Sequence, residues 1–269
     1  MEDPKSNEIN VSKYIIKQTP VGHLTQALEN LTIVCGEELM DRDEVKAEIK
    51  NYQEDHLEHF VYNDQKVIVS KLNKDSDNFY HDQNKGIRYQ LAENNKEITG
   101  VETVEEGSEL RKAVDAELLK YKEKYYKGGV TTTNVFYDPA NGKLNVMISA
   151  HNINMKNFWS GEWLSTWEFE TSSKTLKGSV KANTYYYEEG NIQFNLKTEF
   201  SESINGDDNA SIAKSIVSTI EKKENDVQMD LEKVYDNFSD HYIKPLRRKL
   251  PVTGTKMNWN LHQVQYGKH

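Results

Sequence analysis

The last 28 residues carry the most distinctive chemistry of this 269-residue sequence. They contain no acidic residue and six basic ones, which are Lys244, Arg247, Arg248, Lys249, Lys256 and Lys268. The whole chain has a net charge of −9, so the first 241 residues carry −15. A basic tail on an acidic body indicates a negatively charged partner, which could be a nucleic acid, an anionic lipid surface or an acidic protein.

The tail also keeps apolar residues that a solvated chain end would have no reason to retain. They are Leu246, Leu250, Val252, Met257, Trp259, Leu261 and Val264. In a helix over Lys256–Tyr266, Met257, Leu261 and Val264 would share one face, and Trp259 would lie on the other. A short amphipathic helix of this kind usually docks into a groove, and basic residues mixed with Trp and Leu also suit an anionic membrane surface.

Metal and catalytic sites receive little support from the sequence. His56 and His59 lie three residues apart beside Glu58, but the HExxH order and a third ligand are absent, so a solvated helix is the favoured interpretation. Cys35 is the single cysteine, which excludes disulfides within the chain and Cys-based metal sites. The chain has no GxSxG motif, P-loop or GxGxxG motif. We therefore expect no enzyme, no metal and no cofactor.

The composition is that of a soluble, intracellular, folded protein. Charged residues make up 29% and hydrophobic residues 36% of the chain, and the 8 Phe, 4 Trp and 15 Tyr argue against wholesale disorder. No run approaches the roughly 18 consecutive apolar residues that a membrane span requires. The start, Met1–Pro4, is acidic where a signal peptide would be basic and then apolar. We expect a cytoplasmic protein.

The elements that must position the tail begin with helices. We expect one body, residues 1–241, and within it residues 1–62 predict three short amphipathic helices in a small antiparallel bundle, with a break at Pro20–Gly22. The part from 63 to 129 predicts two short strands, an acidic loop and a helix. Their ranges are Lys66–Ser70, Gly86–Leu91, Ala92–Gly107 and Ser108–Tyr125.

Residues 130–204 change to a β-type pattern. Turn signals separate the strand-like runs at Asp138–Gly142, Ser160–Gly161, Ser172–Lys174 and Glu188–Asn191. Turns this close leave no room for crossover helices, so the pattern predicts an antiparallel meander of about five strands.

Three of the four tryptophans, Trp159, Trp163 and Trp167, lie within this region. Aromatic platforms that bind nucleic acids are interleaved with Lys and Arg, whereas this stretch has only Lys156 upstream and Glu162 inside. We therefore expect the Trp side chains to pack under a helix and no nucleic acid to bind.

The segment 207–243 predicts one long helix packed across the sheet. Asn209–Ile243 is 35 residues, or about 52 Å at 1.5 Å per residue, whereas a five-stranded sheet is only about 25 Å across. Its apolar stripe consists of Ile212, Ile216, Ile220, Val227, Leu231, Val234 and Phe238. A helix twice as long as its own sheet must leave apolar surface uncovered, and a second subunit with its own sheet would cover it. We thus expect an α+β fold.

Three segments resemble the F-actin capping protein alpha subunit family. Leu246–Trp259 (LRRKLPVTGTKMNW) resembles its C-terminal signature, LRRxLPVTR[TS]K[IM][DN]W. Lys156–Trp167 (KNFWSGEWLSTW) resembles KNFWNGRWRSxW, and Tyr186–Gln193 (YYEEGNIQ) resembles the segment HYYEDGNVQ. The order of the elements also agrees, so the resemblance spans essentially the whole chain.

The resemblance implies a subunit of a pseudo-twofold heterodimer with a capping protein beta subunit. In that family the two sheets join into one, and the two long helices cross it antiparallel to each other. The heterodimer binds the barbed end of an actin filament without calcium and blocks the addition and loss of subunits. We accordingly expect the dimer interface to include Trp159, Trp163, Trp167, Ile220, Val227 and Leu231.

The resemblance also implies that residues 244–269 form the basic amphipathic tail, or tentacle, that contacts actin. We expect Lys244, Arg247, Arg248, Lys249, Lys256, Trp259, Leu261 and Val264 to contribute. The family's basic contact positions fall on Lys244, Arg248 and Gly254, so this chain lacks the third charge. Glu162 likewise replaces a family Arg. Anionic phosphoinositide is an expected regulator, and a non-capping scaffold whose tail binds anionic lipid or an actin-related filament is the alternative.

Overall fold

The computed structural model describes residues 6–105, 107–188 and 190–237. The chain divides into two compact units, residues 1–221 and 222–269. The first contains the helices and strands up to the beginning of the last helix, and the described part of the second is the remainder of that helix. The expected tail, 244–269, and the end of the expected long helix, 238–243, lie outside the described residues.

The chain begins with helices α1 (Ser6–Gln18), α2 (Leu24–Cys35), α3 (Glu37–Met40) and α4 (Asp43–Asp55). Apolar residues at helical spacing make one shared core, consisting of Ile9, Ile16, Leu31, Leu39, Val45, Ile49 and Tyr52. The Tyr52 hydroxyl donates to the carbonyl of Thr19 at 3.0 Å, which ties α4 to the end of α1. The predicted break at Pro20–Gly22 is confirmed, and Gly22 there has φ of +81°.

Short strands follow the helices. They are β1 (His59–Tyr62), β2 (Gln65–Ile68), β3 (Tyr80–Asp82), β4 (Ile87–Leu91) and β5 (Ile98–Thr103). Strands β1 and β2 pair as a hairpin, and β3, β4 and β5 form an antiparallel sheet in that order. The buried rings of Tyr80 and Tyr89 belong to a core that the two sheets share.

The sequence predicted only β2 and β4 among these five strands. The expected loop over Ala92–Gly107 is wrong, because Ile98–Thr103 pairs with β4 as β5. Most side chains of β5 are exposed, so the strand lacks the apolar alternation that would reveal it. It forms by antiparallel pairing with the preceding strand β4, with a register shift between Arg88 and Gln90.

The larger sheet has five strands joined in a meander. After helix α5 (Glu109–Tyr125) come β6 (Val130–Asp138), β7 (Lys143–Asn154), β8 (Trp159–Glu170), β9 (Thr175–Tyr186) and β10 (Ile192–Ser203). Their order is β10-β9-β8-β7-β6, and every neighbouring pair is antiparallel. The predicted meander is confirmed. The predicted start of α5 is also confirmed, since the Ser108 hydroxyl accepts a hydrogen bond from the Arg111 amide at 3.2 Å.

The turn predicted at Ser160–Gly161 is wrong. Both residues lie inside β8, where Gly161 is paired with Asn152 and Thr184. The chain reverses instead at the 3₁₀ turn Met155–Asn157, after which Phe158 takes the left-handed conformation with φ of +59°. A Ser-Gly pair is compatible with a strand as well as with a turn, and the pairing of two long neighbours favoured the strand here.

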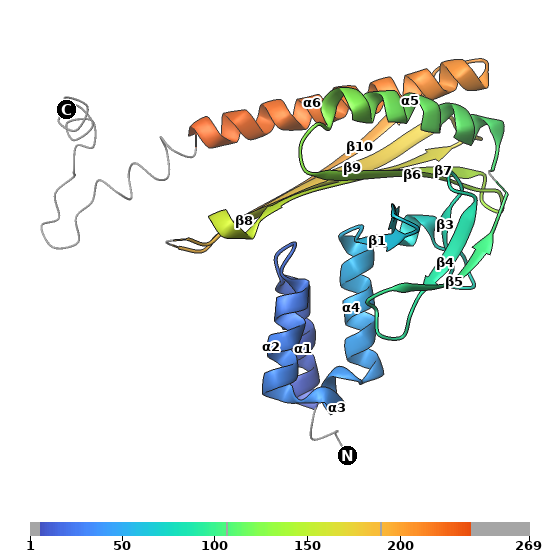
Figure 1. The fold of residues 1–269 in the computed structure, drawn as a ribbon. Coiled ribbons are helices and arrows are strands. Elements are labelled where there is room, and N and C mark those ends of the chain that lie inside the picture. Colours follow the sequence, from blue (N-terminus) through green and yellow to red (C-terminus); the bar gives the residue numbers. More distant parts are fainter. Residues whose placement is uncertain (1–5, 106, 189, 238–269) are drawn as a thin grey trace, which may run out of the picture. The chain divides into compact units, whose positions relative to one another are not determined.

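The sheet has a helix-covered face and an opposite face turned toward the N-terminal helices. Figure 1 shows α5 and the first part of the final helix, α6 (Asn209–Asn237), on one side of the sheet, with α1 to α4 on the other. Ala213, Ile216 and Ile220 of α6 are fully buried. Tyr125 donates a hydrogen bond to Glu221, which links α5 to α6.

Helix α6 is described over 29 residues, or about 44 Å at 1.5 Å per residue. The expectation of a single long helix is therefore confirmed over Asn209–Asn237. Met229, Val234 and Tyr235, in the part beyond Glu221, are each at least 43% exposed. This helix thus keeps apolar side chains at its surface.

The packing of Trp167 leaves no room for a side chain at Gly178. Gly178 lies opposite Trp167 on one side and opposite Phe200 on the other. The Trp167 ring crosses over Gly178 and stacks on Phe200 with ring centroids 5.7 Å apart. A Cβ atom at position 178 would meet the Trp167 ring at 2.2 Å.

Gly178→Ala should therefore lower the free energy of unfolding by roughly 1–3 kcal/mol, because the ring must leave its rotamer. Urea unfolding followed by circular dichroism measures the change. Gly161→Ala in the neighbouring strand is the matched control, because the nearest atoms to its Cβ would be 3.8 Å away. Equal effects of the two substitutions would contradict this account.

Candidate interaction surfaces and a buried polar joint

The residues that we expected to contact actin lie outside the described part of the chain. They are Lys244, Arg247, Arg248, Lys249, Lys256, Trp259, Leu261 and Val264. Their role stays a prediction.

The residues expected at a dimer interface are placed, and they do not form one exposed patch. Trp167 is 1% exposed and Ile220 is fully buried, so both serve the core of this chain. Trp159 and Trp163 are half-buried in β8. In the second unit Val227 is buried and Leu231 is half-buried. Their participation in an interface also stays a prediction.

The free edge of the large sheet is a surface that sequence reasoning did not single out. Strand β10 is 12 residues long and ends the strand order, so within the described residues no strand pairs with its outer side. An edge strand of this length exposes a row of backbone donors and acceptors to other chains. Its side chains alternate between half-buried and exposed from Gln193 to Ser203.

Apolar side chains are also exposed on the N-terminal helices. Val11 and Tyr14 on α1 are 56% and 66% exposed, and Ile33 and Val34 on α2 are each 81% exposed. Single exposed apolar residues are common, and two on each of these two helices are candidates for contact with another chain.

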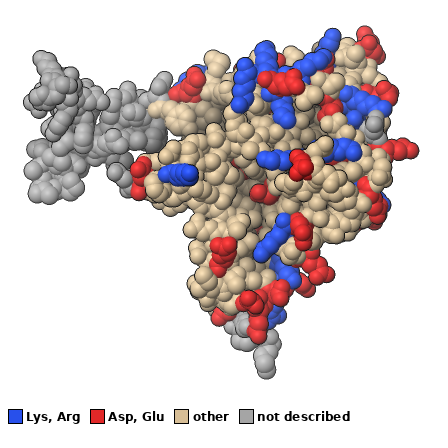
Figure 2. All heavy atoms as spheres, viewed as in Figure 1, with Lys and Arg blue, Asp and Glu red and all other residues tan. Residues whose placement is uncertain are grey.

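Charge on the body is mixed. On the face that Figure 2 shows, Lys and Arg lie interspersed with Asp and Glu. Along α5, Lys112 contacts Glu109 at 3.3 Å and Lys120 contacts Glu117 at 2.7 Å. Exposed pairs of this kind contribute little to stability, but they balance the charge along the helix.

A buried polar joint connects the N-terminal helices to the sheet. It consists of His56, just after α4, Glu162 of β8 and Asn183 of β9. The Nδ1 atom of His56 lies 2.8 Å from Oε1 of Glu162, and the Asn183 side-chain amide donates to the same oxygen. The Glu162 side chain is fully buried, and its Oε2 atom lies 3.7 Å from Nε2 of His151. A buried carboxylate is tolerated only when such partners compensate for its lost hydration.

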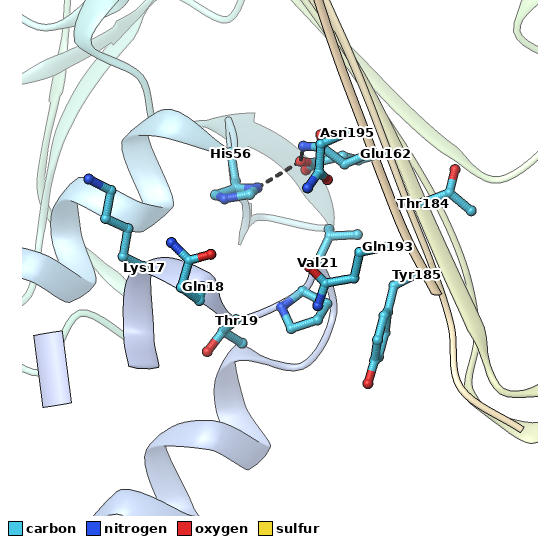
Figure 3. A pocket seen from close by; sticks show the side chains of 12 residues that line it. Lys17, Gln18, Thr19, Val21, His56, Glu162, Thr184, Tyr185, Gln193 and Asn195 are labelled. Atoms are coloured by element: carbon cyan, nitrogen blue, oxygen red, sulfur yellow. Dashed lines mark hydrogen bonds and ion pairs between the residues drawn. The ribbon is translucent and has the colours of Figure 1, made fainter. Parts of the chain in front are cut away.

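A cavity of about 210 Å³ lies beside the joint. Figure 3 shows Lys17, near the end of α1, and Thr19, just after that helix, on one side of the cavity. Tyr185 of β9 and Gln193 of β10 lie on the other side. The wall is largely polar, and the carboxylate of Glu162 is already paired, so the arrangement fits a structural junction better than a reaction centre.

His56 and His59, the pair considered as metal ligands from the sequence, contact different partners. His56 pairs with Glu162, whereas His59 stacks on His151 with ring centroids 4.6 Å apart. Over residues 6–105, 107–188 and 190–237, no three His, Cys, Asp or Glu side chains gather closely enough to hold a metal ion. In the same ranges no helix is both long and apolar enough to cross a membrane.

The comparison with known families decides the identity of this fold. The model of the F-actin capping protein alpha subunit family matches residues 12–269. This chain belongs to that family.

Relatives support the same assignment over nearly the full length. The F-actin-capping protein subunit alpha of Saccharomyces cerevisiae is 27% identical over 254 residues, which cover 91% of this chain and 89% of the relative. The protein of the same name from Arabidopsis thaliana is 27% identical over 269 residues, covering 93% and 87%. A solved structure titled as a homodimeric actin capping protein alpha subunit from Plasmodium berghei shares the fold, with a TM-score of 0.75, 24% identity and coverage of 91% and 97%.

The polar joint was not predicted from the sequence. The sequence marked Glu162 only as a departure from the Arg of the family signature. His56 is 106 positions away, and no periodicity connects the two. An acidic residue in place of the Arg of the family signature was nevertheless a usable signal. A buried carboxylate requires hydrogen-bond donors or a basic partner, so Glu162 indicated that such a partner lies nearby.

The stacked histidines beside the joint predict sensitivity to acid. Burial, together with the neighbouring His151, lowers the pKa of His59 to about 3. The pKa of His in an unfolded chain is near 6.5, so below that pH His59 binds a proton in the unfolded chain but not in the folded one. The contribution of neutral, buried His59 to the free energy of unfolding is therefore fully present above pH 6.5, and it is lost as the pH falls from 6.5 toward 3.

His59→Phe should reduce the loss of unfolding free energy between pH 7.5 and 5.0 by about 1–2 kcal/mol, because Phe stacks on His151 and does not titrate. Urea unfolding at the two pH values measures it. His59→Gln separates titration from packing, since it should flatten the pH dependence equally while lowering stability at both values. An unchanged pH dependence in both variants would refute the role of His59.

Proposed function

We propose that this chain is the alpha subunit of a heterodimeric capping protein that binds the barbed ends of actin filaments without calcium and blocks the addition and loss of subunits. One observation carries the proposal: the family match runs to residue 269 and so includes the basic tail with its signature. The named relatives are alpha subunits of F-actin-capping proteins. The complex would act in the cytoplasm on the actin cytoskeleton, as a binding protein and not as an enzyme.

The body supports a beta subunit as partner. A pseudo-twofold heterodimer needs a free sheet edge and a long helix with apolar surface, and this chain has both in β10 and in the Met229–Tyr235 part of α6. A second sheet joined at β10 would satisfy the outer row of backbone groups. The first four helices would form an antiparallel bundle beneath the sheet, with their exposed apolar residues facing the partner.

The tail supplies the actin contact in this proposal. Lys244 and Arg248 would make the first electrostatic encounter with the acidic end of the filament, with the other basic residues adding to the field. Trp259, Leu261 and Val264 would then bury apolar surface and slow dissociation. Phosphoinositides would compete for the same positive charge and so regulate capping.

The test is actin polymerisation from filament seeds with the full-length chain in complex with a capping protein beta subunit. The complex should stop barbed-end growth equally with calcium and with a calcium chelator. Deletion of 244–269 should abolish the effect. Arg248→Glu should lower the association rate about tenfold at low salt, because exposed charges mainly steer association.

Lys268→Glu changes the net charge by the same amount but lies outside the signature, so it serves as the matched control. If both charge reversals slow capping equally, the contact is not specific to Arg248. If the intact and the truncated complexes both leave elongation unchanged, capping is refuted. Sedimentation of the intact complex with phosphoinositide vesicles then tests the scaffold alternative.

Gly254 offers a gain-of-function test, because the family has an Arg at this position. Gly254→Arg should slow the dissociation of the complex from filament ends by roughly two- to fivefold, as expected for one added exposed charge contact. Gly254→Gln controls for side-chain size and for the lost flexibility of Gly. Depolymerisation of capped filaments after dilution reports the dissociation rate, and equal rates for the two variants would contradict a charge contact at this position.

A further inference from the structure

A cleft of about 610 Å³ lies within the first unit, between helices α2 and α4, strand β1 and the loop that joins β4 to β5. The apolar side chains in its wall include Leu24 and Leu28 of α2, Ile49 of α4 and Phe60 of β1. Small-molecule sites in proteins are typically clefts of roughly 300–1,000 Å³ that combine apolar walls with a few polar groups. The cleft therefore has the size and the lining of such a site.

Hydrogen bonds hold the polar part of the wall in place. Gln53 of α4 is 5% exposed, and its Nε2 atom donates to the carbonyl of Asn95 in the β4–β5 loop at 2.7 Å. The side-chain amide of Asn95 donates in turn to the carbonyl of Lys46 on α4 at 3.0 Å. The loop is thus joined to the helix by two buried or partly buried hydrogen bonds. A wall that is already ordered does not have to be ordered by a ligand, which favours binding.

Three groups in this wall can accept hydrogen bonds but have no partner among the residues that the structure describes. They are the Oε1 atom of Gln53, the Nε2 atom of His59 and the carboxylate of Glu58. The neutral His59 ring donates to the backbone of Ser149, so its remaining nitrogen, Nε2, is an acceptor. Buried polar atoms are normally hydrogen-bonded, so unpaired acceptors along one cleft favour a ligand that donates.

The charge of the wall favours a cation. Of the described residues that line the cleft, Glu29, Glu58 and Glu97 are acidic and Lys96 alone is basic. Burial raises the pKa of the Glu58 carboxyl, and a positive charge beside it would offset the free-energy cost of its lost hydration. An ammonium group supplies that charge together with three N–H donors, whereas an anion or a carbonyl group would bring only further acceptors.

We propose that this cleft binds a small organic ammonium ion, which is a ligand with a positively charged nitrogen on an apolar chain or ring. The nitrogen lies at Glu58 and Gln53, and the apolar part packs against Leu24, Leu28 and Ile49. The ligand contacts α2, α4 and β1 together, so it stabilises the folded body increasingly as its concentration rises. The inference goes beyond the proposed function, because the cleft is built by the body of the chain and its occupation requires neither actin nor a beta subunit.

Ligand-observed nuclear magnetic resonance of the full-length chain tests the proposal, with 2-phenylethylamine as the probe. The amine should bind with a dissociation constant of about 1 mM or below, and 2-phenylethanol, which has a similar shape but no charge, should bind about tenfold more weakly. Equal affinities would mean that only apolar surface is recognised, which would overturn the proposal. Absence of amine binding at about 10 mM would overturn it too.

Charge removal tests the role of Glu58. Glu58→Gln keeps the size of the side chain and removes its charge, so it should weaken binding of the amine about tenfold and leave binding of the alcohol unchanged. Glu97→Gln is the matched control, because it removes the same charge at an exposed position of the rim, where water and salt screen it. An equal loss of affinity in the two variants, or no loss in Glu58→Gln, would contradict recognition by Glu58.

Filling the cleft locates the probe. Thr25 is an exposed residue of α2 that lines the cleft, so Thr25→Trp should block the amine and the alcohol alike. Asn30→Trp is the control, because Asn30 is exposed on the same helix but is not part of the lining. Amine binding that persists in Thr25→Trp, or that is lost equally in Asn30→Trp, would place the probe elsewhere and refute the site.

Discussion

The register of the five-stranded sheet is the constraint on which the rest of this structure depends. Because side chains alternate along each strand, the pairing of β7, β8, β9 and β10 decides which residues meet the covering helices and which meet the N-terminal helices. A slip of one position at β8 would turn Trp167 away from Phe200 and would move Glu162 to the apolar face. The aromatic stack and the polar joint are therefore two consequences of a single pairing.

The joint shows how this fold accommodates a buried carboxylate. Glu162 occupies a fully buried position, and its compensation comes from a histidine after α4 and an amide on β9. Neither partner alone would offset the lost hydration of a carboxylate. The end of α4, β8 and β9 must therefore supply matching side chains before Glu162 can be buried. A substitution at one of these positions then requires compensating residues at the other two.

The sequence predicted the elements whose signals are local. Periodic apolar residues indicated α2, a capping serine indicated α5, and closely spaced turns indicated the meander. It failed where a strand is defined by its pairing and not by its own pattern of side chains. Strand β5 is largely exposed, lacks an apolar alternation and forms by pairing with β4, and the Ser160–Gly161 pair was assigned to a turn although it lies between two long neighbouring strands. The link between His56 and Glu162 spans 106 positions and had no local signature.

The meander also has a consequence for the order in which the chain can fold. Each hairpin from β6 to β10 closes a short loop, so the sheet can assemble strand by strand as the chain leaves the ribosome. The N-terminal helices are made first, yet their attachment through His56 must wait for β8 and β9. We expect β10, which is synthesised last of the five strands, to complete the sheet only after that attachment is possible, so β9 is the temporary edge of the sheet until β10 pairs with it.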